Sequence, residues 1–115
     1  MTFLPPRIKR DSGKKQAGKR FPSHCKWVRG HQCCVPGCID MPIEAAHVRN
    51  GTGGSMSVKP HDKWVISLCR FHHSEQHRVG ERTFEARHGI DMKALAERFA
   101  AQSPHRFKWL EHDDG

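Results

Sequence analysis

Four candidate zinc ligands recur in two short segments of the chain. Cys33 and Cys38 flank a turn that a Pro-Gly dipeptide closes, and Cys69 and His72 form a Cys-x2-His pattern. Structural zinc takes four thiolate or imidazole ligands in a tetrahedron, commonly one pair from a turn and a second pair from another turn or a helix start. The spacing therefore predicts a structural zinc site.

Alternative ligand assignments stay open. Cys34 can take the place of Cys33, and His73 can pair with Cys69 because the two are i and i+4 on a helix. The cysteines can also be buried free thiols that act as small apolar side chains. The recurrence of four candidates in paired turns favours zinc, and Cys25 is left over.

His73 and His77 suit a second, catalytic divalent ion. An i, i+4 pair on a helix presents both imidazoles on one face, about 6 Å apart. His72 is rotated from His73 by about 100° around the helix axis, so adjacent histidines can serve different ions. The chain contains ten histidines, five of them within residues 47–77, and this clustering is its strongest chemical signal.

Short helices and strands must position these ligands, and the pattern predicts an α+β fold. Capping and stop residues predict a helix from Ser23 to Gly30 with Trp27 and Val28 facing the core, and later helices opened by Thr83 and Asp91. β-prone runs bounded by polar residues predict two strands. These expected strands, their Gly-rich connection and the His-rich helix span residues 43–48, 64–68, 49–61 and 70–78.

With these elements the chain resembles the HNH, or ββα-metal, nucleases, and most closely the phage and prophage proteins related to the recombination-enhancing Ref-type nucleases. The likeness covers roughly residues 23–100. It is carried by three stretches: Ala45-Ala46-His47-Val48-Arg49, Lys59-Pro60-His61-Asp62-Lys63-Trp64, and Leu68-Cys69-Arg70-Phe71-His72-His73-Ser74-Glu75-Gln76-His77-Arg78.

The resemblance implies a zinc-stapled site for hydrolysis of DNA phosphodiesters. His47 matches the general base that deprotonates water, while His73 and His77 match ligands of a catalytic Mg²⁺, Mn²⁺ or Zn²⁺ ion. Ala46 stands where many members carry a third ligand, so Glu44 or Asp62 is expected to replace it, or water or phosphate oxygens are expected to fill that position. Asp62 is also the nearest residue able to orient the base. The matched structural zinc ligands are Cys33, Cys38, Cys69 and His72.

Chain length and net charge limit the number of domains, the kind of partner and the location that the sequence allows. A chain of 115 residues holds one small domain, and its net charge of +8 favours a polyanionic partner such as DNA. No apolar run exceeds three residues, which argues against a membrane span and a secretory signal. Together with five cysteines, this predicts a reduced, cytoplasmic location in a bacterial host cell.

The expected domain organisation is a disordered basic tail over residues 1–22 followed by a nuclease-like domain over residues 23–115. Residues 1–20 alone supply +6 of the net charge of +8. The tail and the flanks of the site are expected to neutralise DNA phosphates. The predicted DNA contacts are Arg7, Lys9, Arg10, Lys14, Lys15, Lys19, Arg20, Arg49, Lys59, Lys63, Arg70 and Arg78.

The sequence thus predicts a metal-dependent DNA endonuclease of phage origin linked to recombination, with a recombinase or another DNA-processing protein as a further partner. A non-catalytic zinc-containing DNA-binding or recombination accessory module is the first alternative. A structural zinc adaptor for protein partners is the second, and it predicts no salt-dependent affinity for DNA.

Overall fold

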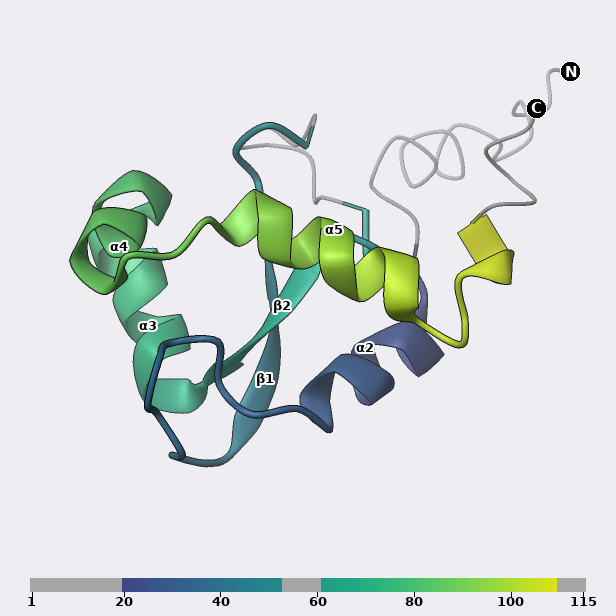
Figure 1. Ribbon diagram of the computed structural model, residues 1–115, viewed down its shortest axis with the longest axis horizontal. Coiled ribbons are helices and arrows are strands. Elements are labelled where there is room, and N and C mark those ends of the chain that lie inside the picture. The colour runs from purple at the N-terminus through teal and green to yellow at the C-terminus, as the bar shows by residue number, and fades with distance from the viewer. Residues whose placement is uncertain (1–19, 53–60, 110–115) are drawn as a thin grey trace, which may run out of the picture.

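The computed structural model describes residues 20–52 and 61–109, and the fold is α+β (Figure 1). Two antiparallel strands form a single sheet, and the helices surround it. The helices and strands, in chain order, are α2 (Pro22–Arg29), β1 (Ile43–His47), β2 (Val65–Cys69), α3 (Arg70–Val79), α4 (Glu81–His88) and α5 (Met92–Gln102).

The register of the sheet places both ends of β1 beside chemically important parts of the chain. Ile43 pairs with Cys69 at one end, and His47 pairs with Val65 at the other. Helix α3 begins immediately after β2, so its first turns contact β1 as well as β2. The sheet therefore fixes the positions of His47, Cys69 and α3, the His-rich helix, relative to one another.

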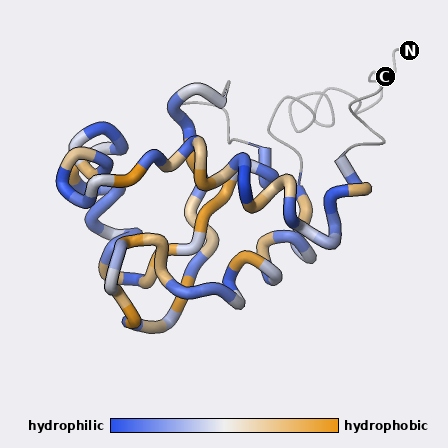
Figure 2. The backbone as a smooth tube through the Cα atoms, in the orientation of Figure 1, coloured by the Kyte–Doolittle hydropathy of each residue, from blue (hydrophilic) through white to orange (hydrophobic). Residues whose placement is uncertain are grey.

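The hydrophobic core is small and centres on β2, in which all five residues are buried. Helix α5 contacts β2 and lies across the sheet in Figure 1, while α2 contacts both strands. Figure 2 shows that α3 and α4 are mostly hydrophilic, in keeping with a mean hydropathy of −0.76. The largest fully buried apolar side chains are Phe84, Ile66, Leu68 and Met92.

A second apolar cluster includes Phe21, near the first described residue. Phe21 packs with Ala100 and Trp109 and is only 7% exposed. Phe21 therefore belongs to the packed structure, although the sequence placed residues 1–22 in the basic tail. Local composition could not reveal this, because Phe21 is buried by residues about 80 positions further along the chain.

Two predicted helix ends are confirmed and two are wrong. Gly30 and the Asp91 cap lie where expected, and Asp91 Oδ1 accepts from the Ala94 N–H at 3.1 Å. Ser23 is not a cap, because α2 begins at Pro22, whose fixed φ suits the first helical position. Thr83 lies inside α4, which starts after Gly80 at a φ of +91° that glycine adopts readily.

Two smaller expectations about the core and the second strand also change. Trp27 is half-buried and stacks edge-on against His31 and Phe99, whereas Val28 is fully buried as predicted. The second strand runs one residue later than expected, so that Cys69 belongs to both β2 and the cap of α3. Within the described residues, no helix is long and apolar enough to cross a membrane.

Candidate metal centre and histidine pocket

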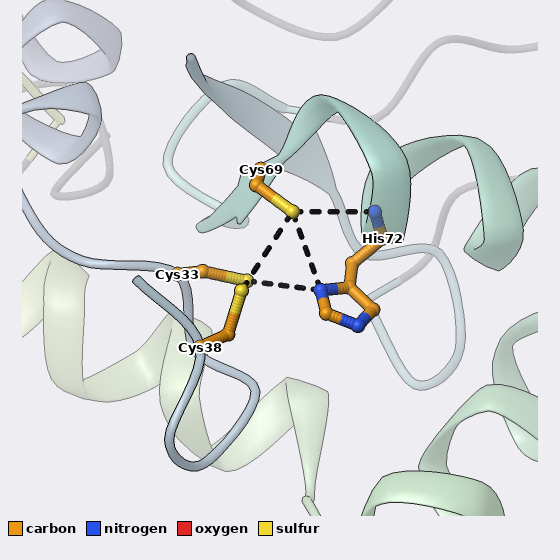
Figure 3. A group of neighbouring side chains, drawn as sticks. All are labelled: Cys33, Cys38, Cys69 and His72. Carbon is orange, nitrogen blue, oxygen red and sulfur yellow. Dashed lines mark hydrogen bonds between the residues drawn. The ribbon is translucent and has the colours of Figure 1, made fainter. Parts of the chain in front are cut away.

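Three cysteines and one histidine converge at the junction of β2 and α3 (Figure 3). Cys33 and Cys38 come from the loop between α2 and β1, while Cys69 and His72 come from the end of β2 and the first turn of α3. Their ligand atoms all lie within 4.8 Å of one another. The predicted quartet is thus brought together, and this Cys3His group could bind a metal ion such as zinc.

The distances within the quartet match the edges of a coordination tetrahedron. Tetrahedral zinc with Zn–S near 2.3 Å and Zn–N near 2.0 Å has S···S edges of about 3.8 Å and S···N edges of about 3.5 Å. Cys38 Sγ and Cys69 Sγ are 3.9 Å apart, and His72 Nδ1 is 3.5 Å from Cys33 Sγ and 3.3 Å from Cys69 Sγ. These three distances are therefore those expected around one tetrahedral ion.

Helix α3 positions the Cys69 sulfur. This residue is the N-cap of α3, and its Sγ accepts from the His72 N–H at 3.4 Å. Burial raises the pKa of the Cys33 thiol. A metal ion bound by the quartet would counter that effect, because coordination deprotonates a thiol.

The structure decides between the alternative ligands. Cys34 turns to Ser67, with Sγ 3.5 Å from the Ser67 Oγ, and it is not a member of the quartet. His73 faces Glu44 rather than Cys69. Cys33 and His72 are therefore the ligands that accompany Cys38 and Cys69.

A second group of possible metal ligands lies beside the quartet, but its carboxylate already has hydrogen-bond partners. Glu75 lies near His72 and His88, close enough for the three to share an ion. However, its two oxygens accept from Arg87 Nη1 and His88 Nε2, each at 2.8 Å. A guanidinium at that distance disfavours a further cation, so this group links α3 to α4.

Three histidines predicted to act together line one pocket of about 640 Å³. His47 comes from the end of β1, and His73 and His77 come from α3. The pairing of β1 with β2, and the direct continuation of β2 into α3, bring these parts of the chain to the same place. The full lining is His47, Arg49, Asn50, His73, Gln76, His77, Gly80 and Glu81.

His73 and His77 present their Nε2 atoms to each other at 3.2 Å. Two imidazoles that bind one ion at 2.0–2.1 Å have N···N separations of about 3.0–3.4 Å for octahedral or tetrahedral angles. Burial and the neighbouring His73 lower the pKa of His77, which favours the neutral form that binds metals. The two Nε2 atoms can therefore coordinate one divalent ion.

Glu44 is not placed as the third ligand that the sequence suggested. Its Oε1 accepts from His73 Nδ1 at 2.7 Å, on the ring edge away from Nε2, and its Oε2 accepts from Arg70 at 3.3 Å. Carboxylates in this position fix the tautomer of a metal-binding histidine and make its other nitrogen a better ligand. Glu44 thus orients His73.

Asp62 contacts the predicted general base directly. Its Oδ1 lies 2.8 Å from His47 Nε2. Burial alone would raise the pKa of Asp62, but hydrogen bonds from His47 and the Phe21 N–H, with the charge of Arg20, lower it to about 2. Because this carboxylate can only accept, His47 Nε2 carries a proton, and in the neutral ring Nδ1 is left with the free lone pair.

Four residues of the pocket were not predicted as site residues, namely Asn50, Gln76, Gly80 and Glu81, and two of them, Gln76 and Glu81, make side-chain contacts that hold the pocket together. Gln76 is buried and donates from Nε2 to the His47 carbonyl at 3.3 Å. The Glu81 oxygens accept from the backbone N–H groups of Arg49 and Asn50 at 2.8 and 2.9 Å, which fixes the chain just after β1. Neither has a local signal, because the contacts join residues about 30 positions apart.

The predicted DNA contacts divide into three groups. Arg49 lines the pocket, and Arg70 and Arg78 are exposed on α3, the helix that carries His73 and His77. Arg20 and Lys63 serve other partners: Arg20 is bound to Asp62, and Lys63 Nζ lies 5.0 Å from the centre of the Trp64 ring. The others fall outside the described residues: Arg7, Lys9, Arg10, Lys14, Lys15, Lys19 and Lys59.

Comparisons with known proteins place the sequence in an uncharacterised group. A family model described as "Protein of unknown function (DUF968)" matches residues 11–103. Over 73 residues, 63% of this chain, the sequence is 34% identical to "Uncharacterized protein YdfU" of Escherichia coli (strain K12). The match spans about a fifth, 20%, of that relative's length. No solved structure matches.

Proposed function

The chain belongs to the DUF968 family of proteins of unknown function, and we propose that it is a metal-dependent DNA endonuclease of the HNH type. The observation that carries the proposal is the convergence of His47, His73 and His77 on one pocket. A base with a free nitrogen stands beside two imidazoles that face each other at the separation a shared ion requires. General-base and metal-assisted hydrolysis need these two components together.

In the proposed reaction, His47 Nδ1 takes a proton from a water molecule as the water oxygen forms a bond to phosphorus. The P–O3′ bond then breaks, and the departing O3′ is protonated by solvent, which leaves a 5′ phosphate and a 3′ hydroxyl. Asp62 keeps Nε2 protonated and the ring oriented throughout. A divalent ion held by His73 and His77 would stabilise the negative charge that develops on the phosphate and on O3′.

The Cys3His group is proposed to hold a structural Zn²⁺ ion. It joins the loop before β1 to the first turn of α3, and α3 carries His73 and His77. Because the hydrophobic core is small, the ion would supply folding free energy as well as order in the site. Helix α3 therefore contributes both to the zinc site, which stabilises the fold, and to the pocket, which carries out the proposed hydrolysis.

Substituting Ala for His77 tests the proposed metal pair. We expect the variant to bind Mn²⁺ at least 10–100-fold more weakly, because even outer-sphere partners of a metal cost about that much. Titration calorimetry of the zinc-loaded protein measures it, and plasmid nicking should require correspondingly more Mn²⁺. His31→Ala, which removes an exposed imidazole at the end of α2, is the matched control. Equal Mn²⁺ affinity in wild type and His77→Ala would refute the pair.

DNA is the proposed substrate because the chain carries a net charge of +8, much of it before residue 20. Replacing Arg7, Lys9, Arg10, Lys14, Lys15 and Lys19 by Gln should weaken DNA binding. It should also flatten the plot of log affinity against log salt by about 0.9 for each phosphate that is no longer neutralised. Fluorescence anisotropy at several salt concentrations measures the slope. Arg82→Gln, an exposed site on α4, should leave the slope unchanged, and a slope unaltered by the six substitutions would exclude these residues as DNA contacts.

A non-catalytic DNA-binding or recombination accessory module is the second candidate. The position of Glu44 favours it, since the carboxylate expected to complete the ligand set faces the other edge of the His73 ring. This candidate predicts zinc binding and salt-dependent DNA affinity without cleavage in Mg²⁺, Mn²⁺, Ni²⁺ or Zn²⁺. A phage origin, action in the cytoplasm of a bacterial host and a recombinase partner belong to both candidates.

A further inference from the structure

Residues 20 and 21 donate hydrogen bonds to the carboxylate that holds the proposed base. Asp62 Oδ1 accepts from Arg20 Nη1 at 2.9 Å and from His47 Nε2 at 2.8 Å. Asp62 Oδ2 accepts from the Phe21 N–H at 2.8 Å. Two of the donors to this carboxylate therefore come from residues 20 and 21, about 40 positions earlier in the chain.

Packing fixes the position of the Phe21 N–H. The Phe21 ring lies 5.0 Å from the His61 ring and 5.4 Å from the Trp109 ring, centre to centre. It is 7% exposed, and the Asp62 side chain is 8% exposed, so the contact lies inside the domain. Arg20 adds a charged donor from the surface, where its side chain is 40% exposed.

This arrangement gives Arg20 a structural role. Its position in a basic segment suggests a DNA contact, but its guanidinium donates to Asp62. A carboxylate that accepts only from His47 could rotate about its own side-chain bonds, and the imidazole would rotate with it. Donors on both oxygens hold the carboxylate plane, and the carboxylate then fixes which imidazole nitrogen carries the proton. Orientation of this kind governs reactivity, since small displacements of a reacting group cost large factors in rate.

We propose that Arg20, with the Phe21 N–H, is a positioning residue for His47 rather than a DNA contact. The inference rests on the proposed hydrolytic function and goes beyond it, because it links the base to Arg20, the last cation of the basic run over residues 7–20.

Arg20→Gln, Arg20→Lys and Arg78→Gln in the full chain test the proposal. Arg20→Gln should lower kcat for plasmid nicking about three- to tenfold, the loss expected for a typical hydrogen bond, with KM and the salt slope unchanged. Arg20→Lys keeps the charge and should restore much of kcat. Arg78→Gln removes an exposed arginine from α3 without touching Asp62 and should change KM and the salt slope instead. A change in KM and salt slope with constant kcat in Arg20→Gln would overturn the proposal, as would no change at all.

A spectroscopic measurement separates this proposal from the function on which it rests. In ¹⁵N-labelled wild-type protein, we expect His47 to populate the neutral form protonated at Nε2, and in Arg20→Gln we expect that population to fall. An unaltered His47 signal in Arg20→Gln overturns the positioning role even if the wild type cleaves DNA. An altered signal in a protein that does not cleave DNA refutes the proposed function and leaves the structural link from Arg20 to His47 in place.

Discussion

Substituting Ser for Cys69 is expected to leave the domain without zinc and unfolded at room temperature. Cys69 is 1% exposed, belongs to the metal quartet and caps α3, so one substitution removes a ligand and disturbs the start of the helix. Binding of structural zinc contributes about 10–16 kcal/mol in small zinc domains. Because native domains are stable by only about 5–15 kcal/mol, losing the ion exceeds what a small core can replace.

Zinc content and thermal denaturation measure this effect. Wild-type protein should carry one tightly bound equivalent and lose its cooperative transition when a strong chelator removes it. Cys34→Ser is the matched control, since Cys34 contacts the Ser67 hydroxyl and lies outside the quartet. That variant should keep both its zinc and its transition. A Cys69→Ser protein that melts cooperatively without metal would show that the quartet is not a structural zinc site.

Replacing His47 by Ala is expected to reduce cleavage about 10²–10⁴-fold, the usual contribution of a general base. The imidazole is part-exposed in the pocket and contacts Asp62, while the His47 backbone carbonyl, which the substitution keeps, accepts from Gln76. Its removal takes away the proton acceptor and leaves the quartet and the α3 histidines intact. Zinc content, thermal stability and DNA affinity should therefore stay close to those of the wild type.

A plasmid-nicking assay run with saturating Mn²⁺ or Mg²⁺ measures the reduction, and anisotropy measures binding in parallel. His31→Ala should cleave at the wild-type rate, because this imidazole lies on another surface, at the end of α2. Nicking that persists unchanged in His47→Ala would remove His47 from the mechanism. Binding without nicking in the wild type, across all four metals, would instead support the accessory module.

Three positions whose roles depend on tertiary contacts illustrate why the sequence could not settle the whole site. Arg20 looked like one of seven cationic residues in a tail, but it lies 2.9 Å from Asp62, 42 positions away. Glu44 shares a strand face with Ala46 and so suggested a ligand, yet its carboxylate meets the other edge of His73. Cys33 and Cys34 are adjacent, and only the packing of Cys34 on Ser67 separates them.

What the sequence determined by itself were the features encoded within a few residues of each other. The Cys-x2-His pattern, the i, i+4 spacing of His73 and His77, the β-prone runs and the Asp91 cap depend on local geometry, which short stretches of chain specify. The folded structure alone decided the partners. Which thiol joins the quartet, which atom of His47 stays free and what holds Asp62 all depend on residues 15 or more positions apart, and these meet only when the core packs.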